Sequence, residues 1–188
     1  DEASKLSELG IYACDEGVAV SFGKGKTFFL HEVFFVTKDF LSENLTKALL
    51  NTKSIATFDI KRCYDYIGEY RPAMFDCEIL AYLIDPLKGD YNSADVAERY
   101  ISRYTKPYKE AVNDKIYYSC LCAENAILCK DVLLSEVKKL GMDKLFFDIE
   151  MPLSFVLYSM EKEGVLVDKK ALEVYSDRLS TSIDKLEK

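Results

Sequence analysis

The fold class is decided by residues 9–31, LGIYACDEGVAVSFGKGKTFFLH. This stretch contains three short runs rich in strand-forming residues, namely Leu9 to Cys14, Val18 to Phe22 and Thr27 to His31. Two polar turns that contain glycine separate the runs, and glycine permits the positive φ of tight hairpins. The stretch therefore predicts an antiparallel meander of three strands.

Beyond Thr37 the period of the apolar residues changes from two to between three and four, which predicts a helix that ends near Leu50. Strands and helices then alternate. Ser54 to Phe58 predicts a short strand, Ile60 to Ile67 a helix, Ala73 to Phe75 another strand, and Cys77 to Ile84 a helix with Asp76 as its N-cap and Asp85-Pro86 as its stop. Strands followed by strand–helix alternation predict a mixed sheet flanked by helices, the α/β class.

Helices dominate the second half of the chain. Ser93 opens a predicted helix to Tyr100, residues 101–114 form the least structured stretch, and Ile116 to Leu140 is a long amphipathic helix ended by Gly141. Two more helices follow, Asp148 to Glu163 and one that Asp168 caps. The last helix carries an apolar stripe that reaches the end of the chain, so we expect it to belong to a larger structure.

Composition excludes several classes of function. A net charge of -7 argues against tight, sequence-independent binding of duplex nucleic acid by this segment, because such binding depends on Lys and Arg. His31 is the single histidine and the six cysteines form no paired C-x-x-C knuckles, so we expect reduced, buried thiols rather than a zinc site. No apolar run reaches the roughly 20 residues that span a membrane. The opening residues, Asp1 to Ser7, carry no initiator Met and are interpreted as a cut within a larger protein.

Two stretches carry a resemblance to a known family. Thr57-Phe58-Asp59-Ile60-Lys61-Arg62, followed by residues 74–86 (MFDCEILAYLIDP), is similar to the second exonuclease motif of bacterial DNA polymerase I and the helix after it. Residues 149–168 (IEMPLSFVLYSMEKEGVLVD) resemble the junction that opens the polymerase portion of the same enzymes.

The resemblance implies an RNase H-like exonuclease fold, with three antiparallel strands followed by two parallel ones. It implies that residues 1–144 are a 3′–5′ exonuclease-like domain and that residues 145–188 begin the polymerase domain. It also implies a role in DNA replication and repair. The expected partners are the remainder of the polymerase chain and, through that parent enzyme, primer–template DNA. We expect a monomeric, cytoplasmic bacterial segment, associated with the nucleoid through the parent enzyme.

Exonucleases of this family hydrolyse a phosphodiester with two divalent ions, which four acidic residues hold. The resemblance places Asp59 at the aspartate of the second motif. On the late helix, Ala123-Glu124-Asn125-Ala126 resembles the family's AEDA, which places Asn125 at a metal-binding aspartate and Leu121 at the tyrosine that precedes it. Neither residue can perform the matching task.

The first strand of the family carries a D-x-E, and two readings of it remain. If Leu9 to Glu16 is the first strand, Cys14-Asp15-Glu16 stands at D-x-E and the leading acid is lost. If Leu9 to Cys14 is instead the second strand, the D-x-E strand lies outside this chain. We favour the first reading, because it gives three strands in a chain of suitable length.

We therefore expect an inactive nuclease domain without a metal ion or other cofactor. The alternative is an active exonuclease in which Asp15, Glu16, Asp59 and Glu124 hold Mg²⁺ or Mn²⁺. A ribonuclease of the related ribonuclease D type is a third reading, which the junction at 149–168 disfavours. As structural roles, we expect Asp59 to be a helix N-cap that pairs with Lys61 or Arg62, and Glu124 to lie on a solvated helix face.

Overall fold

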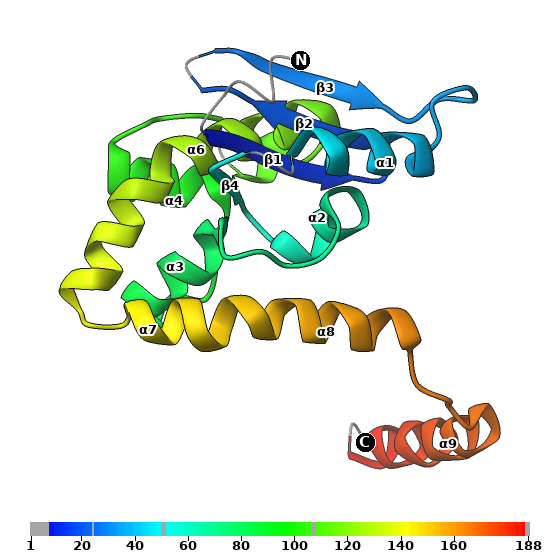
Figure 1. The fold of residues 1–188 in the computed structure, drawn as a ribbon. Helices are drawn as coiled ribbons and strands as arrows, with labels where there is room; N and C mark the ends of the chain where they lie inside the picture. Colours follow the sequence, from blue (N-terminus) through cyan, green and yellow to red (C-terminus); the bar gives the residue numbers. More distant parts are fainter. Residues whose placement is uncertain (1–7, 24, 50–51, 107, 187–188) are drawn as a thin grey trace. The chain divides into compact units, whose positions relative to one another are not determined.

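A computed structural model describes residues 8–23, 25–49, 52–106 and 108–186 (Figure 1). The chain divides into two compact units, Asp1–Tyr158 and Ser159–Lys188, with the division inside one helix. The opening segment, Asp1 to Ser7, and the expected helix end at Leu50 lie outside the described residues.

The first unit is built around a five-stranded sheet. Its strands are β1 (Glu8–Cys14), β2 (Gly17–Ser21), β3 (Thr27–His31), β4 (Ser54–Thr57) and β5 (Met74–Asp76). Their order is β3-β2-β1-β4-β5, antiparallel from β1 to β3 and parallel across β1, β4 and β5. The predicted mixed sheet is confirmed, and β1 lies at its centre as the first strand of the meander.

The helices follow the predicted order with two differences. Their bounds are α1 Lys38–Leu49, α2 Ile60–Ile67, α3 Cys77–Ile84, α4 Ser93–Ile101, α5 Tyr108–Ala111, α6 Lys115–Lys139, α7 Asp143–Leu145, α8 Met151–Glu163 and α9 Lys169–Leu186. Helix α5 was missed because four residues are too few to show a period. The helix expected from Asp148 is instead preceded by α7 and a π-helical stretch at Phe146–Glu150, where Pro152 has no N–H to continue the regular ladder.

Helix α6 packs directly on the sheet, behind β1 and β2 in Figure 1. A Cβ added at Gly10 would lie 1.8 Å from the carbonyl oxygen of Ala123, so a residue without a side chain permits this approach. Strand side chains alternate between faces, so Leu9 and Ile11 point to the opposite face, where they are fully buried. Helix α2 contacts β1 and packs beside α1.

A buried lysine joins two parallel strands at their beginnings. Lys130 of α6 is 4% exposed, and its Nζ donates to Glu8 Oε1 at 2.9 Å and to Ser54 Oγ at 3.0 Å. Glu8 starts β1 and Ser54 starts β4. A buried ammonium needs such partners, since burying it without them is costly. Lys130 therefore ties β1 and β4 at the end of the sheet opposite the one where Asp59 and Asp76 lie.

The second unit contains the end of α8 and the helix α9. Gly164, with φ 71°, ends α8, and Asp168 Oδ1 accepts from Ala171 N at 3.1 Å, which confirms the predicted cap of α9. Within the described residues no helix is long and apolar enough to cross a membrane. The expected domain boundary between 144 and 145 stays a prediction, since the compact first unit runs on to Tyr158.

Candidate functional site

Two aspartates lie where the adjacent parallel strands β4 and β5 end, Asp59 two residues after β4 and Asp76 as the last residue of β5. Asp76 serves both helices that begin there. Its Oδ1 accepts from Glu78 N at 2.8 Å and Ile79 N at 3.4 Å, which confirms the predicted cap of α3. Its Oδ2 accepts from Ile60 N at 2.7 Å, at the start of α2. Asp76 is 3% exposed, so one buried carboxylate fixes the N-termini of α2 and α3 relative to each other.

Asp59 lies at the N-cap position of α2 but does not act as its cap. Among the described residues its side chain accepts no capping hydrogen bond, and its backbone is left-handed, with φ 56° and ψ 74°. Its Oδ2 instead pairs with Arg62 Nε at 2.7 Å. The capping prediction for Asp59 is thus wrong, because its left-handed backbone departs from the extended conformation of a capping residue and its carboxylate pairs with Arg62 instead. The predicted pairing with Arg62 is confirmed.

The carboxyls behind Asp59 are difficult to ionise. Burial raises the pKa of Asp76 from 3.8 to about 6, although its three backbone hydrogen bonds act in the opposite direction. Burial, with the charges of Asp76 and Asp59, raises the pKa of Glu78 from 4.5 to about 7. Negative charge is therefore unfavourable here, and each ionised carboxyl increases the free-energy cost of ionising its neighbours.

Two pockets meet at these residues. The larger, of about 460 Å³, lies between α2, α3 and α8, and Asp59, Asp76 and Glu78 line it together with apolar residues such as Leu153. The smaller, of about 150 Å³, lies against β1 and α6. Asp59, Glu78 and Tyr91 line both pockets.

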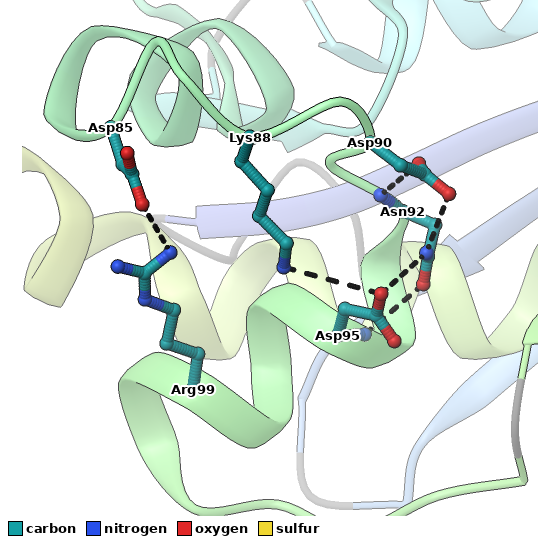
Figure 2. Close-up of polar contacts among 6 residues, drawn as sticks. All are labelled: Asp85, Lys88, Asp90, Asn92, Asp95 and Arg99. Atoms are coloured by element: carbon teal, nitrogen blue, oxygen red, sulfur yellow. Dashed lines mark hydrogen bonds and ion pairs between the residues drawn. The ribbon is translucent and has the colours of Figure 1, made fainter.

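The loop between α3 and α4 holds Tyr91 against both pockets. Figure 2 shows Asp85, just after α3, facing Arg99 of α4, and Lys88 of the loop facing Asp95 of α4; the ion pairs measure 2.7 Å and 4.0 Å. The Tyr91 hydroxyl donates to the Asp85 carbonyl oxygen at 2.6 Å. These contacts fix a short loop at both ends, so they hold Tyr91 in place where it lines the two pockets.

The side chains of β1 and α6 that line the smaller pocket are uncharged. The rings of Tyr12 and Tyr118 meet edge to face, with their centroids 5.8 Å apart. Burial raises the pKa of both hydroxyls far above the ordinary value. Burial also raises the pKa of Cys122 to about 12, and its thiol is hydrogen-bonded with Tyr118 and Ser93. At neutral pH these side chains stay protonated and offer no anionic ligand.

The predicted residues of the first strand lie elsewhere. Cys14 ends β1 and, with Asp15 and Arg62, lines a separate pocket of about 280 Å³. The Asp15 side chain is 85% exposed and pairs with Lys115 Nζ at 3.0 Å. Glu16 is exposed in the turn between β1 and β2. The β1 residue that lies with Asp59 is Tyr12, two positions before Cys14 and therefore on the same face of the strand.

The predicted residues of the late helix are also dispersed. Glu124 and Leu121 line a fourth pocket, and the Glu124 side chain is only 16% exposed, hydrogen-bonded to Gly25 N at 2.7 Å and paired with Arg103. The expectation of a solvated face for Glu124 is wrong, because the β2–β3 turn and Arg103 cover it. Asn125 is fully buried and its Nδ2 donates to Ser93 Oγ at 3.1 Å.

Sequence reasoning missed the residues that surround Asp59. Tyr118 stands four residues before the buried Cys122 on α6, a spacing that places both on one helix face, and this signal could have found Tyr118. Tyr91 and Glu78 carried no such signal, because a loop and a second helix bring them to the site. Across the described residues, no group of three His, Cys, Asp or Glu side chains is arranged to hold a metal ion.

The fold and site define a mixed α/β domain with a polar pocket at the ends of its parallel strands. No protein-family model matches the chain. The chain is 27% identical to DNA polymerase I of Geobacillus stearothermophilus over 187 residues, which is 92% of this chain and 21% of that protein. It is 30% identical to DNA polymerase I of Bacillus caldotenax over 151 residues, 72% of this chain and 17% of that protein.

A solved structure has the same fold. The POL domain of Pol1 from M. smegmatis, in complex with DNA primer-template and dNTP, superimposes with a TM-score of 0.72 and 19% identity over 98% of this chain and 33% of that chain. The resemblance to DNA polymerase I is thereby confirmed over most of the chain. The chain spans about a fifth of the length of these curated relatives.

Proposed function

We propose that the chain is the 3′–5′ exonuclease-like part of a DNA polymerase I that acts in replication and repair, and that its nuclease centre is inactive. In this proposal residues 1–144 form an RNase H-like module that supports the polymerase, and residues 145–188 begin the polymerase domain. The partners are the remaining polymerase chain and, through it, primer–template DNA. The parent protein is cytoplasmic.

The observation that carries the proposal is the separate engagement of the candidate acids. Asp59 is paired with Arg62, Asp15 with Lys115, and Glu124 with Arg103. The three acids share no pocket. Asp59 lines the two pockets between the helices and the strand ends, Asp15 lines the pocket at Cys14, and Glu124 lines the pocket at Arg103. A two-ion mechanism needs its carboxylates around ions roughly 4 Å apart.

The groups beside Asp59 do not fit a pair of divalent ions. Magnesium prefers carboxylate oxygens, whereas Tyr12 and Tyr118 are neutral there. Asp76 is occupied by three backbone donors. Arg62 brings a fixed positive charge to Asp59, where the activity would need a metal ion.

The test is a nuclease assay on the full polypeptide that carries this chain. Single-stranded DNA labelled at its 5′ end is incubated with Mg²⁺ and, separately, with Mn²⁺. We expect no metal-dependent shortening from the 3′ end above the background of an Asp59→Ala variant prepared in parallel.

The alternative, an active nuclease built on Asp15, Glu16, Asp59 and Glu124, predicts the opposite result. Shortening would then occur, and both Asp59→Ala and Glu124→Gln would abolish it. Asp143→Asn, a carboxylate change outside the four pockets, serves as the matched control. Its activity should equal that of the unmodified protein in either case.

A further inference from the structure

A basic and aromatic segment interrupts this acidic chain. Residues 99–109, RYISRYTKPYK, contain four Arg or Lys residues, three tyrosines and no Asp or Glu, although the chain as a whole has a net charge of -7. The segment links the end of α4 to α5. Interleaved cations and aromatic rings are the side chains that single-stranded nucleic acid binds, since they meet its phosphates and the faces of its bases.

This segment borders a pocket of about 400 Å³. The pocket is lined by Arg103, Tyr104 and Thr105, by Tyr117 and Glu124 of α6, and by Gly25 and Thr27 of the β2–β3 hairpin. Its volume lies within the usual range of ligand pockets. None of its lining residues among those described also lines the two pockets at Asp59.

The aromatic groups at the pocket are accessible. Tyr104 is 78% exposed, and Tyr117 is 36% exposed with Lys106 Nζ 4.8 Å from its ring centroid. A tyrosine with so much free surface offers one face for stacking, at little cost in side-chain entropy. Lys106 places a positive charge over the neighbouring ring, where a phosphate adjoining a stacked base would lie.

Two polar atoms at the pocket lack partners. Arg103 Nη1 and Thr105 Oγ1 are both buried and, among the described residues, hydrogen-bonded to nothing. The other terminal nitrogen of Arg103 pairs with Glu124, which fixes the plane of the guanidinium. Buried donors normally have acceptors, so a donor held in place without one is suited to an acceptor from a ligand.

The charge of Glu124 would not repel an anionic ligand as an unpaired carboxylate would. Burial acts to raise its pKa, but the hydrogen bonds from Arg103 and Gly25 N, with the charge of Arg103, lower it overall. The carboxylate is thus ionised and neutralised by Arg103. Lys106, over the ring of Tyr117, adds a positive charge beside the pocket.

We propose that this pocket binds single-stranded nucleic acid, with a backbone phosphate accepting from Arg103 and Thr105 beside Lys106, and an unpaired base stacked on Tyr104. A duplex would require a broader positive surface than this one segment supplies. The pocket lies apart from Asp59, so the binding is independent of whether the chain cleaves DNA.

The test is binding of fluorescent oligothymidylate and oligouridylate to the full polypeptide, measured by anisotropy, together with photocrosslinking of an iodouridine-substituted strand. We expect a crosslink to a peptide that contains Tyr104 or Tyr117. Tyr104→Ala should weaken binding about tenfold, the effect of losing one stacked base. Lys106→Gln should reduce the slope of log affinity against log salt by about 0.7, the value for one phosphate contact on a single strand.

Matched controls separate local from general effects. Phe34→Ala removes an aromatic ring that is 89% exposed outside the pocket, and Lys47→Gln removes an exposed lysine of α1. Both should bind as the unmodified protein does. The two oligonucleotides decide between DNA and RNA as the natural strand.

Three outcomes would overturn the proposal. The first is crosslinking that leaves both tyrosine peptides unlabelled. The second is an equal loss of affinity in Tyr104→Ala and Phe34→Ala. The third is preferential displacement of the strand from the pocket by an acidic peptide, which would assign the site to a protein partner.

Discussion

Asp59 and Asp76 lie at the ends of neighbouring parallel strands, each directly before a helix, yet their surroundings in the structure differ. Asp76 is 3% exposed and accepts three backbone hydrogen bonds from two helices. Asp59 has a side chain that is 32% exposed, a left-handed backbone and one ion pair. The aspartate that the family resemblance marks as functional is thus dispensable for capping, whereas the one without a functional role holds the local fold.

The comparison teaches that two aspartates at neighbouring strand ends can have different structural roles, because their surroundings differ. Around Asp59 the neighbours are a guanidinium, two tyrosines and two carboxyls whose pKa is raised. Asp76 keeps its role because backbone donors at α2 and α3 need an acceptor whatever the chemistry of the site. The difference between the two residues can be measured.

The largest effect is expected from Asp76→Ala. It leaves buried N–H groups at two helix starts without an acceptor, so the free energy of unfolding should fall by about 3 kcal/mol. Urea unfolding followed by circular dichroism measures this. Asp76→Asn keeps one acceptor oxygen and should lose less than half as much. A smaller loss for Asp76→Ala than for Asp59→Ala would reverse the comparison.

The next effect is a dependence of stability on pH that originates at Asp76. Its pKa is raised by folding from 3.8 to about 6, so the folded state binds the extra proton between these values. This contribution to stability is fully present below pH 3.8 and is lost as the pH rises through 6, at up to about 1.4 kcal/mol per pH unit. Glu78, with its pKa raised to about 7, acts in the same direction.

Unfolding free energies measured from pH 4 to 7 test this sign. As the pH rises, the free energy of unfolding of the unmodified protein should fall steadily relative to that of Asp76→Asn. A constant difference would mean that the Asp76 carboxyl titrates alike in the folded and unfolded states.

A smaller effect on stability is expected at Asp59, where two substitutions separate the cost of the left-handed backbone from the contribution of the side chain. Its φ of 56° suits glycine, so Asp59→Gly should equal or exceed the unmodified protein in stability, whereas Asp59→Ala should be about 1 kcal/mol less stable than Asp59→Gly. Thermal unfolding of the two variants measures the difference. Equal melting temperatures would indicate that the left-handed conformation costs nothing here.

The smallest effect is expected from Arg62→Ala. The pair with Asp59 is solvent-exposed, with side-chain exposures of 56% and 32%, so the free energy of unfolding should change by less than about 0.5 kcal/mol. Urea unfolding at low and high salt checks this value. A loss comparable with that of Asp76→Ala would show that Asp59 is structural after all.

The sequence by itself determined the strands, most helices and the resemblance to DNA polymerase I, because these depend on local periodicity, turn residues and contiguous motifs. The strands Leu9 to Cys14 and Thr27 to His31 were predicted within one residue of their observed ends. The cap at Asp76 was also predicted for α3, since the side chain and its donors are adjacent in sequence.

Only the tertiary structure decided which side chains meet. That Asp76 also serves α2 and that Glu124 is covered by the β2–β3 turn are contacts between elements distant in the chain. The periodicity of a strand or helix indicates which of its side chains share one face. It does not indicate which other element that face packs against. The packing of α6 against Gly10 settles that choice here, and it brings Tyr12 to Tyr118.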